Sequence, residues 1–376
     1  MEGVTQHNRS ALPDDWTTGV FVGRMLTDAG PSPILVVHGD LYDMADVAPT
    51  VSALVERGDF TGAGGRNLGR FSLDETRLLA PVDLQCVKAC GVTFAVSAIE
   101  RVIEERARGD WNAAAAIRER LESRIGGSIR SVSPGSPEAA ALKSALIEDG
   151  LWSQYLEVAI GPDAEVFTKA PVLASVGADA EIGIRSDSHW NNPEPEVALL
   201  VNSAGQPVGA TLGNDVNLRD FEGRSALLLG KAKDNNGSCA LGPLVRLFDA
   251  GYTIDDVRQA EIGLTIQGED GFVLHGQSNM REISRDPLDL VRQTLSEHQY
   301  PDGFVLFMGT LFAPVEDRDE PGRGFTHKVG DTVAIENSRL GRLVNRVVTS
   351  KDAAPWQMGI GALMNNLAAR GLLQGA

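Results

Sequence analysis

Short apolar runs separated by turn residues dominate the chain. The runs at residues 19–26 and 33–39 alternate with Gly, Pro and Asp, which is typical of short β-strands. The apolar runs at 84–94, 197–201 and 303–310 also have the length of strands and are bounded by polar or turn residues. Many short strands with few long helices predict a β-rich α+β fold.

Helical periodicity is concentrated in one segment, at about residues 96–150. Within it we expect one helix that begins near residue 96, a second over residues 111–125 and a third over residues 137–147. Gly and Pro residues separate the three helices. This helical insertion has two interpretations, a lid that covers a site or an ordinary packed layer, and both stay open at this point.

The pattern also divides the chain near residue 80. Residues 1–80 contain short strands, one short helix and glycine-rich turns, which predict a small N-terminal domain. Residues 81–376 contain the helical insertion and most of the strands, and they predict the main domain. A chain of 376 residues is long enough to bury a core of this size.

Charge and composition narrow the range of partners. The formal net charge of −17 disfavours binding to nucleic-acid backbones or anionic membranes. The three cysteines form no disulfide framework, and the N-terminus lacks the basic and apolar pattern of a signal peptide. No apolar run approaches the length of a membrane span. We therefore expect a cytoplasmic protein with no nucleic-acid or membrane partner.

The densest candidate chemistry lies between Glu194 and Asp215. Glu194 and Glu196 are two residues apart, and because side chains alternate along a strand, both would point to the same face. The polar turn at residues 203–207 would reverse the chain and bring Asp215 beside them. Converging carboxylates repel each other unless a cation lies between them, and oxygen ligands suit Mg²⁺, Mn²⁺ or Ca²⁺. The pair of glutamates alone would also fit two solvated side chains at the start of a strand.

A series of motifs resembles the fumarylacetoacetate hydrolase superfamily. The matching segments are Glu194-Pro195-Glu196, Asn214-Asp215 with Arg219-Asp220, Ala232-Lys233, and Ser238-Cys239-Ala240-Leu241-Gly242-Pro243. Further matches are Gly309-Thr310, Lys328-Val329-Gly330-Asp331 and Leu340-Gly341-Arg342-Leu343-Val344-Asn345. The resemblance covers the chain from about residue 80 onward and implies the mixed β-roll of that superfamily.

The resemblance also implies roles for individual residues. Glu194, Glu196 and Asp215 match the metal-binding carboxylates of the family, with Mg²⁺ as the expected ion and Mn²⁺ as the alternative. Lys233 matches the active-site lysine, whose pKa we expect to be lowered by partial burial near the cation, so that the neutral amine acts as a base. Lys231 would share the same strand face, and the register of the following motif selects Lys233 instead.

One position departs from the family pattern. Residues 91–100 resemble the motif G-x-N-Y-x-x-H-x-x-E, in which His and Glu together activate water in hydrolase members. Here Ser97 occupies the His position, whereas Glu100 is retained. A serine hydroxyl is a weak base on its own, so the resemblance to hydrolases weakens at this point. Glu100 alone could serve as a general acid or base.

A subgroup of the superfamily lacks the His and dehydrates 2-keto-3-deoxy sugar acids, and the chain is most similar to it. This similarity implies conversion of 2-keto-3-deoxy-D-xylonate or 2-keto-3-deoxy-arabinonate to 2-oxoglutarate semialdehyde in oxidative pentose catabolism, such as D-xylose degradation. Lys233 would remove a C3 proton, Glu100 would protonate the departing C4 hydroxyl, and Thr310 would hold the substrate carboxylate. Further expected substrate contacts are Ser97, Gly309 and Arg185.

Two other functions remain open, together with the oligomeric state. The first is a fumarylacetoacetate-type or acylpyruvate-type hydrolase that cleaves a C–C bond. The second is a binding or scaffold protein that is stabilised by a metal and turns over no substrate. A homodimer or a homotetramer is the expected assembly.

Overall fold

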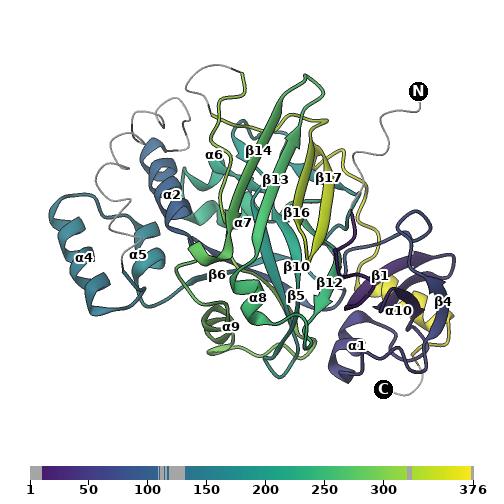
Figure 1. Ribbon diagram of the computed structural model, residues 1–376. Helices are drawn as coiled ribbons and strands as arrows, with labels where there is room; N and C mark the ends of the chain where they lie inside the picture. The colour runs from purple at the N-terminus through teal and green to yellow at the C-terminus, as the bar shows by residue number, and fades with distance from the viewer. Residues whose placement is uncertain are drawn as a thin grey trace.

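The computed structural model describes residues 11–108, 110, 114, 117, 132–319 and 324–373. A ten-stranded sheet lies at its centre (Figure 1). In sheet order its strands are β4 (Arg66–Arg70), β3 (Asp40–Asp43), β2 (Gly30–Val37), β1 (Val20–Thr27), β12 (Cys239–Leu247), β10 (Pro207–Asp215), β9 (Pro195–Val201), β15 (Phe304–Phe307), β5 (Cys86–Gly91) and β6 (Glu165–Ala170). The pairings are antiparallel except for β15 with β5, which is parallel.

A second sheet has five strands and packs against the middle of the first. Its order is β14 (Val273–Asn279), β13 (Glu261–Gln267), β16 (Thr332–Asn337), β17 (Gly341–Thr349) and β7 (Glu181–Ile184). The largest hydrophobic core fills the space between the sheets, with side chains such as Leu199 and Leu306 from one sheet and Ile262 and Ile335 from the other. A two-stranded ribbon of β8 (Asn191–Asn192) and β11 (Asn217–Leu218) lies beside the ends of β9 and β10.

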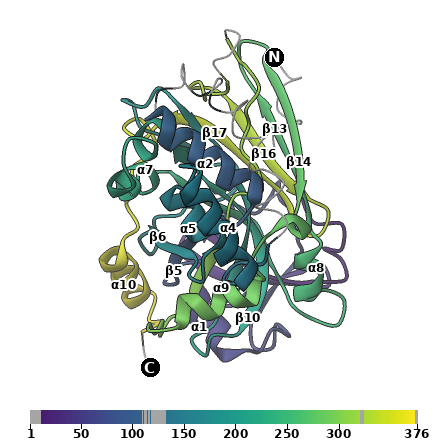
Figure 2. The same ribbon diagram turned by 90° about the vertical axis from the view of Figure 1, so that its left-hand side faces the viewer.

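Three of the helices form a layer on one side of the ten-stranded sheet, and the others lie singly around the molecule. The helices are α1 (Val51–Arg57), α2 (Ala95–Ala107), α4 (Pro137–Glu148), α5 (Gln154–Ile160), α6 (Arg219–Glu222), α7 (Leu229–Lys233), α8 (Ile254–Arg258), α9 (Pro287–Leu295) and α10 (Ile360–Ala369), with 3₁₀ turns at Ala226–Leu228 and Met280–Glu282. Figure 2 shows α2, α4 and α5 together in front of the sheet. These three helices share a hydrophobic core of their own.

Local chemistry explains where several helices begin and end. The Thr50 side chain accepts a hydrogen bond from the backbone N–H of Ala53 at the start of α1, and Gly58 ends the helix with a φ of 68°. The Ser136 side chain caps α4 in the same way, and Pro137 occupies the first helical position. The helices expected near residue 96 and over residues 137–147 are therefore confirmed.

The helical insertion is longer than the sequence indicated. Helix α5 was not predicted, because its seven residues are too few to establish a helical period. The helix expected over residues 111–125 lies outside the described residues, apart from the isolated positions 114 and 117. The β-rich α+β prediction is confirmed by the two sheets.

The N-terminal strands continue the main sheet. β1 pairs with β12, with Phe21 opposite Arg246 and Val22 opposite Val245, so β1 to β4 extend the sheet that carries the site. The hydrophobic core on this side also crosses residue 80, since it contains Val22 and Leu35 together with Val87 and Leu241. The division near residue 80 therefore stays a prediction about folding units, and the sheet does not break there.

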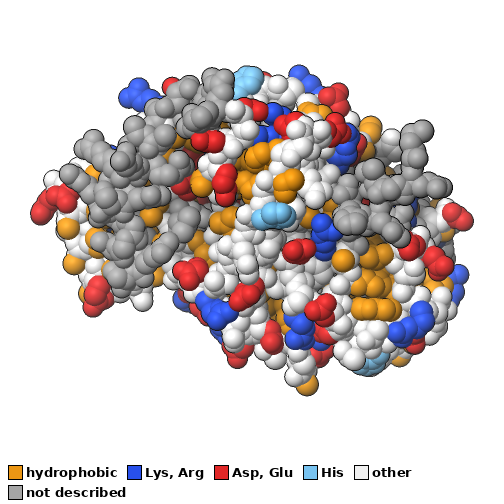
Figure 3. All heavy atoms as spheres, turned by 45° about the horizontal axis from the view of Figure 1, so that its top comes forward, with side chains coloured by type: hydrophobic (Ala, Val, Ile, Leu, Met, Phe, Trp, Pro, Cys, Tyr) orange, Lys and Arg blue, Asp and Glu red, His pale blue; other side chains and the backbone are white. Residues whose placement is uncertain are grey.

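None of the helices in the described ranges combines the length and the apolarity needed to cross a bilayer. Acidic and basic side chains are interspersed over the face shown in Figure 3. The visible part of this face therefore offers no continuous basic surface of the kind that tracks a nucleic-acid backbone.

Candidate active site

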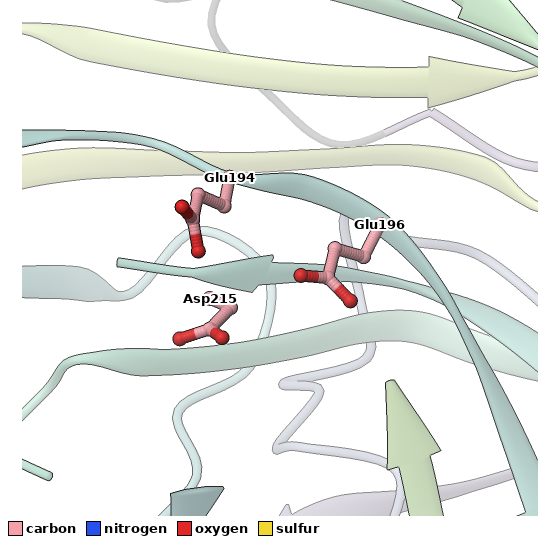
Figure 4. Close-up of side chains that lie close together, drawn as sticks. All are labelled: Glu194, Glu196 and Asp215. Atoms are coloured by element: carbon pink, nitrogen blue, oxygen red, sulfur yellow. The ribbon is translucent and has the colours of Figure 1, made fainter. Parts of the chain in front are cut away.

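The hairpin of β9 and β10 brings the three predicted carboxylates together. Glu196 lies opposite Gly213, and the backbone N–H of Asp215 donates to the Glu194 carbonyl at 3.1 Å. Carboxylate oxygens of Glu194, Glu196 and Asp215 lie within 4.8 Å of one another, and all three side chains are buried. Figure 4 shows them turned toward a common space. The alternative of two solvated glutamates is therefore wrong.

Each of these carboxylates has at least one fixed partner. Glu196 accepts the backbone N–H of Gly309 at 2.7 Å and the Thr310 hydroxyl at 3.2 Å. Asp215 contacts Lys169 at 2.8 Å and Lys233 at 3.0 Å. These partners hold the side chains in place, which is the usual task of groups behind a metal ligand.

Gly309 is required at its position by two independent constraints. Its φ of 103° lies where residues with a side chain are strained. A Cβ atom there would also come within 1.9 Å of the Thr93 hydroxyl oxygen. Only glycine therefore lets the backbone N–H at this position reach Glu196. Gly309 and Thr310, which we predicted to contact substrate, donate hydrogen bonds to the Glu196 carboxylate, and Thr310 also lines the cavity.

Lys233 lies beside two of the carboxylates, but not on a strand. It ends the short helix α7, and its ammonium contacts Glu194 and Asp215. Lys231 is exposed, because residues two apart on a helix point to different sides. The expectation of a shared strand face was wrong, whereas the choice of Lys233 as the residue at the carboxylates agrees with the geometry.

The pKa of Lys233 is shifted in the direction opposite to our expectation. Burial lowers the pKa of this ammonium, but Asp215 and Glu194 raise it by more, and the net result lies above the ordinary lysine value. A divalent cation that shared these two carboxylates would oppose the upward shift, because it would compete for their negative charge.

Lys169 is a site residue that the sequence analysis missed. It lies on β6, is fully buried, and contacts Asp215 together with the backbone carbonyl of Lys233. Burial raises the pKa of the Asp215 carboxyl, yet Lys169 and Lys233 outweigh it and bring the pKa below its usual value. A single lysine in a short strand gives no periodic signal, so only the folded arrangement identifies it.

Helix α2 presents Ser97 and Arg101 to the site, one turn apart. The Ser97 hydroxyl donates to the Thr310 carbonyl at 2.6 Å. Arg101 contacts Glu194 at 2.5 Å. Glu100 lies on the same helix and is buried, but it is not among the residues that line the cavity. The expected role of Glu100 as an acid stays a prediction.

Glu165, at the start of β6, is a second residue that the sequence analysis missed. It lines the same cavity as Lys233 and Ser97. Burial, followed by the nearby Glu222, raises the pKa of Glu165 to about 7. A carboxyl group with this pKa can be protonated at neutral pH, as a general acid requires.

The polar stretch before the carboxylates does not contribute to the cavity. Arg185 pairs with Asp187 at 2.8 Å and lies over the ring of Phe221, and it is not a lining residue. His189 is exposed. The prediction that Arg185 contacts substrate finds no support in this geometry, because Asp187 already holds its guanidinium.

The charges around the triad fit a divalent cation. The connected groups comprise six carboxyl groups (Glu104, Glu165, Glu194, Glu196, Asp215 and Glu222) and four basic groups (Arg101, Lys169, Arg219 and Lys233), so the carboxyl groups outnumber the basic groups by two. Burial, Asp215 and Glu194 raise the pKa of Glu196 well above its usual value, as expected where negative charge is under-compensated. Oxygen ligands of this type suit magnesium.

The cavity itself is nearly filled by side chains. It holds only about 10 Å³ of free volume, and its walls include Arg101, Glu165, Phe167 and Lys233. A groove of about 770 Å³ lies over the five-stranded sheet and contains none of these residues. A small organic acid could therefore enter the site only if side chains around it move.

Comparisons with known proteins find relatives of similar sequence and similar fold. Two curated relatives are a 2-dehydro-3-deoxy-D-arabinonate dehydratase from Saccharolobus solfataricus, 33% identical over 183 residues, and a probable 2-keto-3-deoxyxylonate dehydratase from Haloferax volcanii, 31% identical over 202 residues. These matches span 49% and 54% of this chain, and 58% and 66% of the relatives.

Solved structures show the same fold. A 2-keto-3-deoxy-D-arabinonate dehydratase complexed with magnesium and 2,5-dioxopentanoate superposes with a TM-score of 0.62 at 22% identity, over 88% of this chain and 99% of that one. A fumarylacetoacetate hydrolase from Exiguobacterium antarcticum gives a TM-score of 0.58 at 16% identity, with coverages of 88% and 99%. The family model described as fumarylacetoacetate (FAA) hydrolase C-terminal matches residues 156–348, about half of the chain. The chain belongs to the fumarylacetoacetate hydrolase family.

Proposed function

We propose that the chain is a magnesium-dependent hydro-lyase that removes water from a 2-keto-3-deoxy pentonate to give 2-oxoglutarate semialdehyde. The observation that carries the proposal is one cavity in which Lys233 and Glu165 lie beside the acidic triad. This set offers a base and an acid next to a metal site, which is what loss of water beside a 2-oxo acid needs. The names of the two curated relatives support the same reaction class.

Glu194, Glu196 and Asp215 would hold the metal in this proposal. A bound magnesium ion supplies Lewis-acid polarisation of a 2-oxo acid and takes up part of the negative charge of its ligands. With Glu194 and Asp215 shared in this way, Lys233 would be held less strongly as an ammonium, and its amine would accept the C3 proton of the substrate. Lys169 contacts both Asp215 and the backbone at the end of helix α7, and it holds them in place during the transfer.

We assign the proton donor to Glu165 instead of Glu100. Glu165 lines the cavity, whereas Glu100 does not, and a carboxyl group must reach the departing C4 hydroxyl to protonate it. A later proton shift from C5 gives the enol of the aldehyde. Ser97 is already engaged with the Thr310 carbonyl, so we give it a structural role at the cavity wall.

The test is incubation of the purified protein with Mg²⁺ and a panel of 2-keto-3-deoxy pentonates, followed by mass spectrometry. We expect loss of one water from at least one of them, and no cleavage of acylpyruvates or fumarylacetoacetate. Robust C–C cleavage would instead support the hydrolase alternative. Turnover of no compound in the panel, with intact metal binding, would support a binding protein. The proposal also places the reaction in oxidative pentose catabolism and expects a homodimer or homotetramer.

A further inference from the structure

Arg101 connects three elements through one buried guanidinium. Its Nη2 donates to Oε1 of Glu194 at 2.5 Å, and its Nη1 contacts Glu104 at 2.6 Å and Glu222 at 3.0 Å. Glu194 precedes β9, Glu104 lies on α2 and Glu222 lies on α6. One side chain therefore links the layer of α2, α4 and α5 to the β9–β10 hairpin with its carboxylates, and to α6, which precedes α7 and Lys233.

Glu194 is held from two sides by this arrangement. The Arg101 guanidinium donates a hydrogen bond to Oε1 of Glu194, and the Lys233 ammonium donates one to Oε2. The guanidinium fixes the orientation of the carboxylate while the second oxygen faces Lys233 and the triad. Groups that hold a metal ligand in this manner commonly set the affinity of the site.

We propose that Arg101 is a positioning residue that couples docking of helix α2 to the metal affinity of Glu194. In this proposal the metal site reaches full affinity only while α2 lies against the hairpin, because the same guanidinium maintains both. The inference rests on the acidic triad as the metal site, which is part of the proposed function, but not on the reaction that follows.

The shape of the guanidinium, more than its charge, carries this role. An arginine presents its donors in a planar fork and can address several carboxylates at once, whereas a lysine is a single point charge. Other contacts of α2 do not depend on Arg101, because Ser97 donates to Thr310 and the helix shares an apolar core with α4 and α5. Arg101→Lys should therefore leave the fold in place while it disturbs Glu194.

The experiment compares Arg101→Lys with Arg106→Lys as the matched control. Arg106 lies on the same helix, and its guanidinium donates to the Gly150 carbonyl at 3.2 Å, away from the triad. Metal affinity is measured by titration with Mn²⁺, with free Mn²⁺ followed by electron paramagnetic resonance. Hydrogen exchange of peptides from residues 95–107 reports docking of α2 in the same samples.

We expect Arg101→Lys to weaken Mn²⁺ binding about 10- to 100-fold, the usual cost of losing a partner behind a metal ligand, and to speed exchange in α2. Arg106→Lys should leave Mn²⁺ affinity unchanged. Unchanged affinity in a folded Arg101→Lys protein would overturn the proposal, and so would weaker affinity with unchanged exchange in α2. If Arg101→Lys does not fold, Glu222→Gln serves as the second variant, because it removes one partner of the guanidinium. It should weaken Mn²⁺ binding and speed exchange in α2, and the proposal would be overturned if both stayed at their wild-type values.

Failure of the dehydratase assignment would be visible separately. A wild-type protein that binds Mn²⁺ but removes no water from the pentonates would count against the proposed function alone. The comparison of Arg101→Lys with Arg106→Lys would keep its meaning in that case, because neither measurement requires turnover.

Discussion

Replacement of Lys169 by methionine tests the buried charge network most directly. The lysine is fully buried, and its ammonium contacts Asp215 at 2.8 Å and the backbone carbonyl of Lys233. Methionine keeps a similar volume, so the substitution should leave no large cavity. What it removes is a positive charge beside a buried carboxylate that stays in place.

The expected loss follows from that geometry. Breaking a buried ion pair by removing one partner costs about 3–5 kcal/mol, because an uncompensated charge remains. Asp215 keeps its contact with Lys233 at 3.0 Å, which places the expected loss at the lower end, about 3 kcal/mol. Urea unfolding in EDTA, followed by circular dichroism, measures this change in the free energy of unfolding.

The loss of stability in Lys169→Met should depend on pH, in a direction that follows from the pKa of Asp215. Burial raises the pKa of Asp215, but Lys169 and Lys233 together bring it below the unfolded value. A carboxyl group whose pKa is depressed on folding stabilises the protein above its unfolded pKa of about 3.9, and this contribution is lost as the pH falls through the folded value. The difference between wild type and Lys169→Met should therefore be largest near neutral pH and should shrink on acidification below about pH 4.

Lys88→Met is the matched control on the adjacent strand. Lys88 donates to the Thr168 hydroxyl at 3.0 Å in an exposed position, opposite Thr168 in the pairing of β5 with β6. Its replacement should change the free energy of unfolding by no more than about 0.5 kcal/mol. If Lys169→Met cost no more than Lys88→Met at pH 7, the reasoning about the buried pair would be refuted.

Three further predictions concern the triad and the proton transfers. Glu196→Gln should weaken Mg²⁺ binding strongly and reduce activity by several orders of magnitude, measured by calorimetry and turnover, and near-full activity after EDTA treatment and readdition of Mg²⁺ would contradict the ligand assignment. Lys233→Met should stop deuterium exchange at C3 of the substrate in D₂O while Lys231→Met does not, and NMR would show the reverse pattern if the two lysines were misassigned. If Glu165 donates the proton, activity should fall as the pH rises through about 7, the value to which burial and Glu222 raise the pKa of Glu165. Glu165→Gln should then abolish dehydration. Loss of dehydration in Glu100→Gln but not in Glu165→Gln would return the role to Glu100.

The β9–β10 hairpin and its three carboxylates could be predicted because the sequence signals for them lie close together in the chain. Glu194 and Glu196 share a face through the period of two in a strand, and a short polar turn returns the chain to Asp215. Lys169, Glu165 and Arg101 could not be found in this way. None of the three belongs to a motif that the sequence analysis used, and each reaches the site only through pairings between distant segments.

Errors in the sequence analysis have similar physical origins. Lys231 and Lys233 were assigned to a strand because alternation over a few residues cannot be told from one helical turn. The role given to Glu100 stays a prediction that rests on the motif alone, and the motif contains no information about which side of α2 faces the cavity. The pairing of β1 with β12 joins positions more than 200 residues apart, and no local pattern reports such a contact.

That long-range pairing has a consequence for the order in which the chain can fold during synthesis. The β9–β10 hairpin carries all three carboxylates, and its two strands are neighbours in sequence, so it can form as soon as it leaves the ribosome. Lys233 is made soon after, but the Gly309 N–H that holds Glu196 arrives only some hundred residues later. β1, made first, must wait for β12 before it can join the sheet. A growing chain therefore carries its negative charges together before it carries every group that compensates them, and magnesium in the surrounding solution is the counter-ion at hand during that interval.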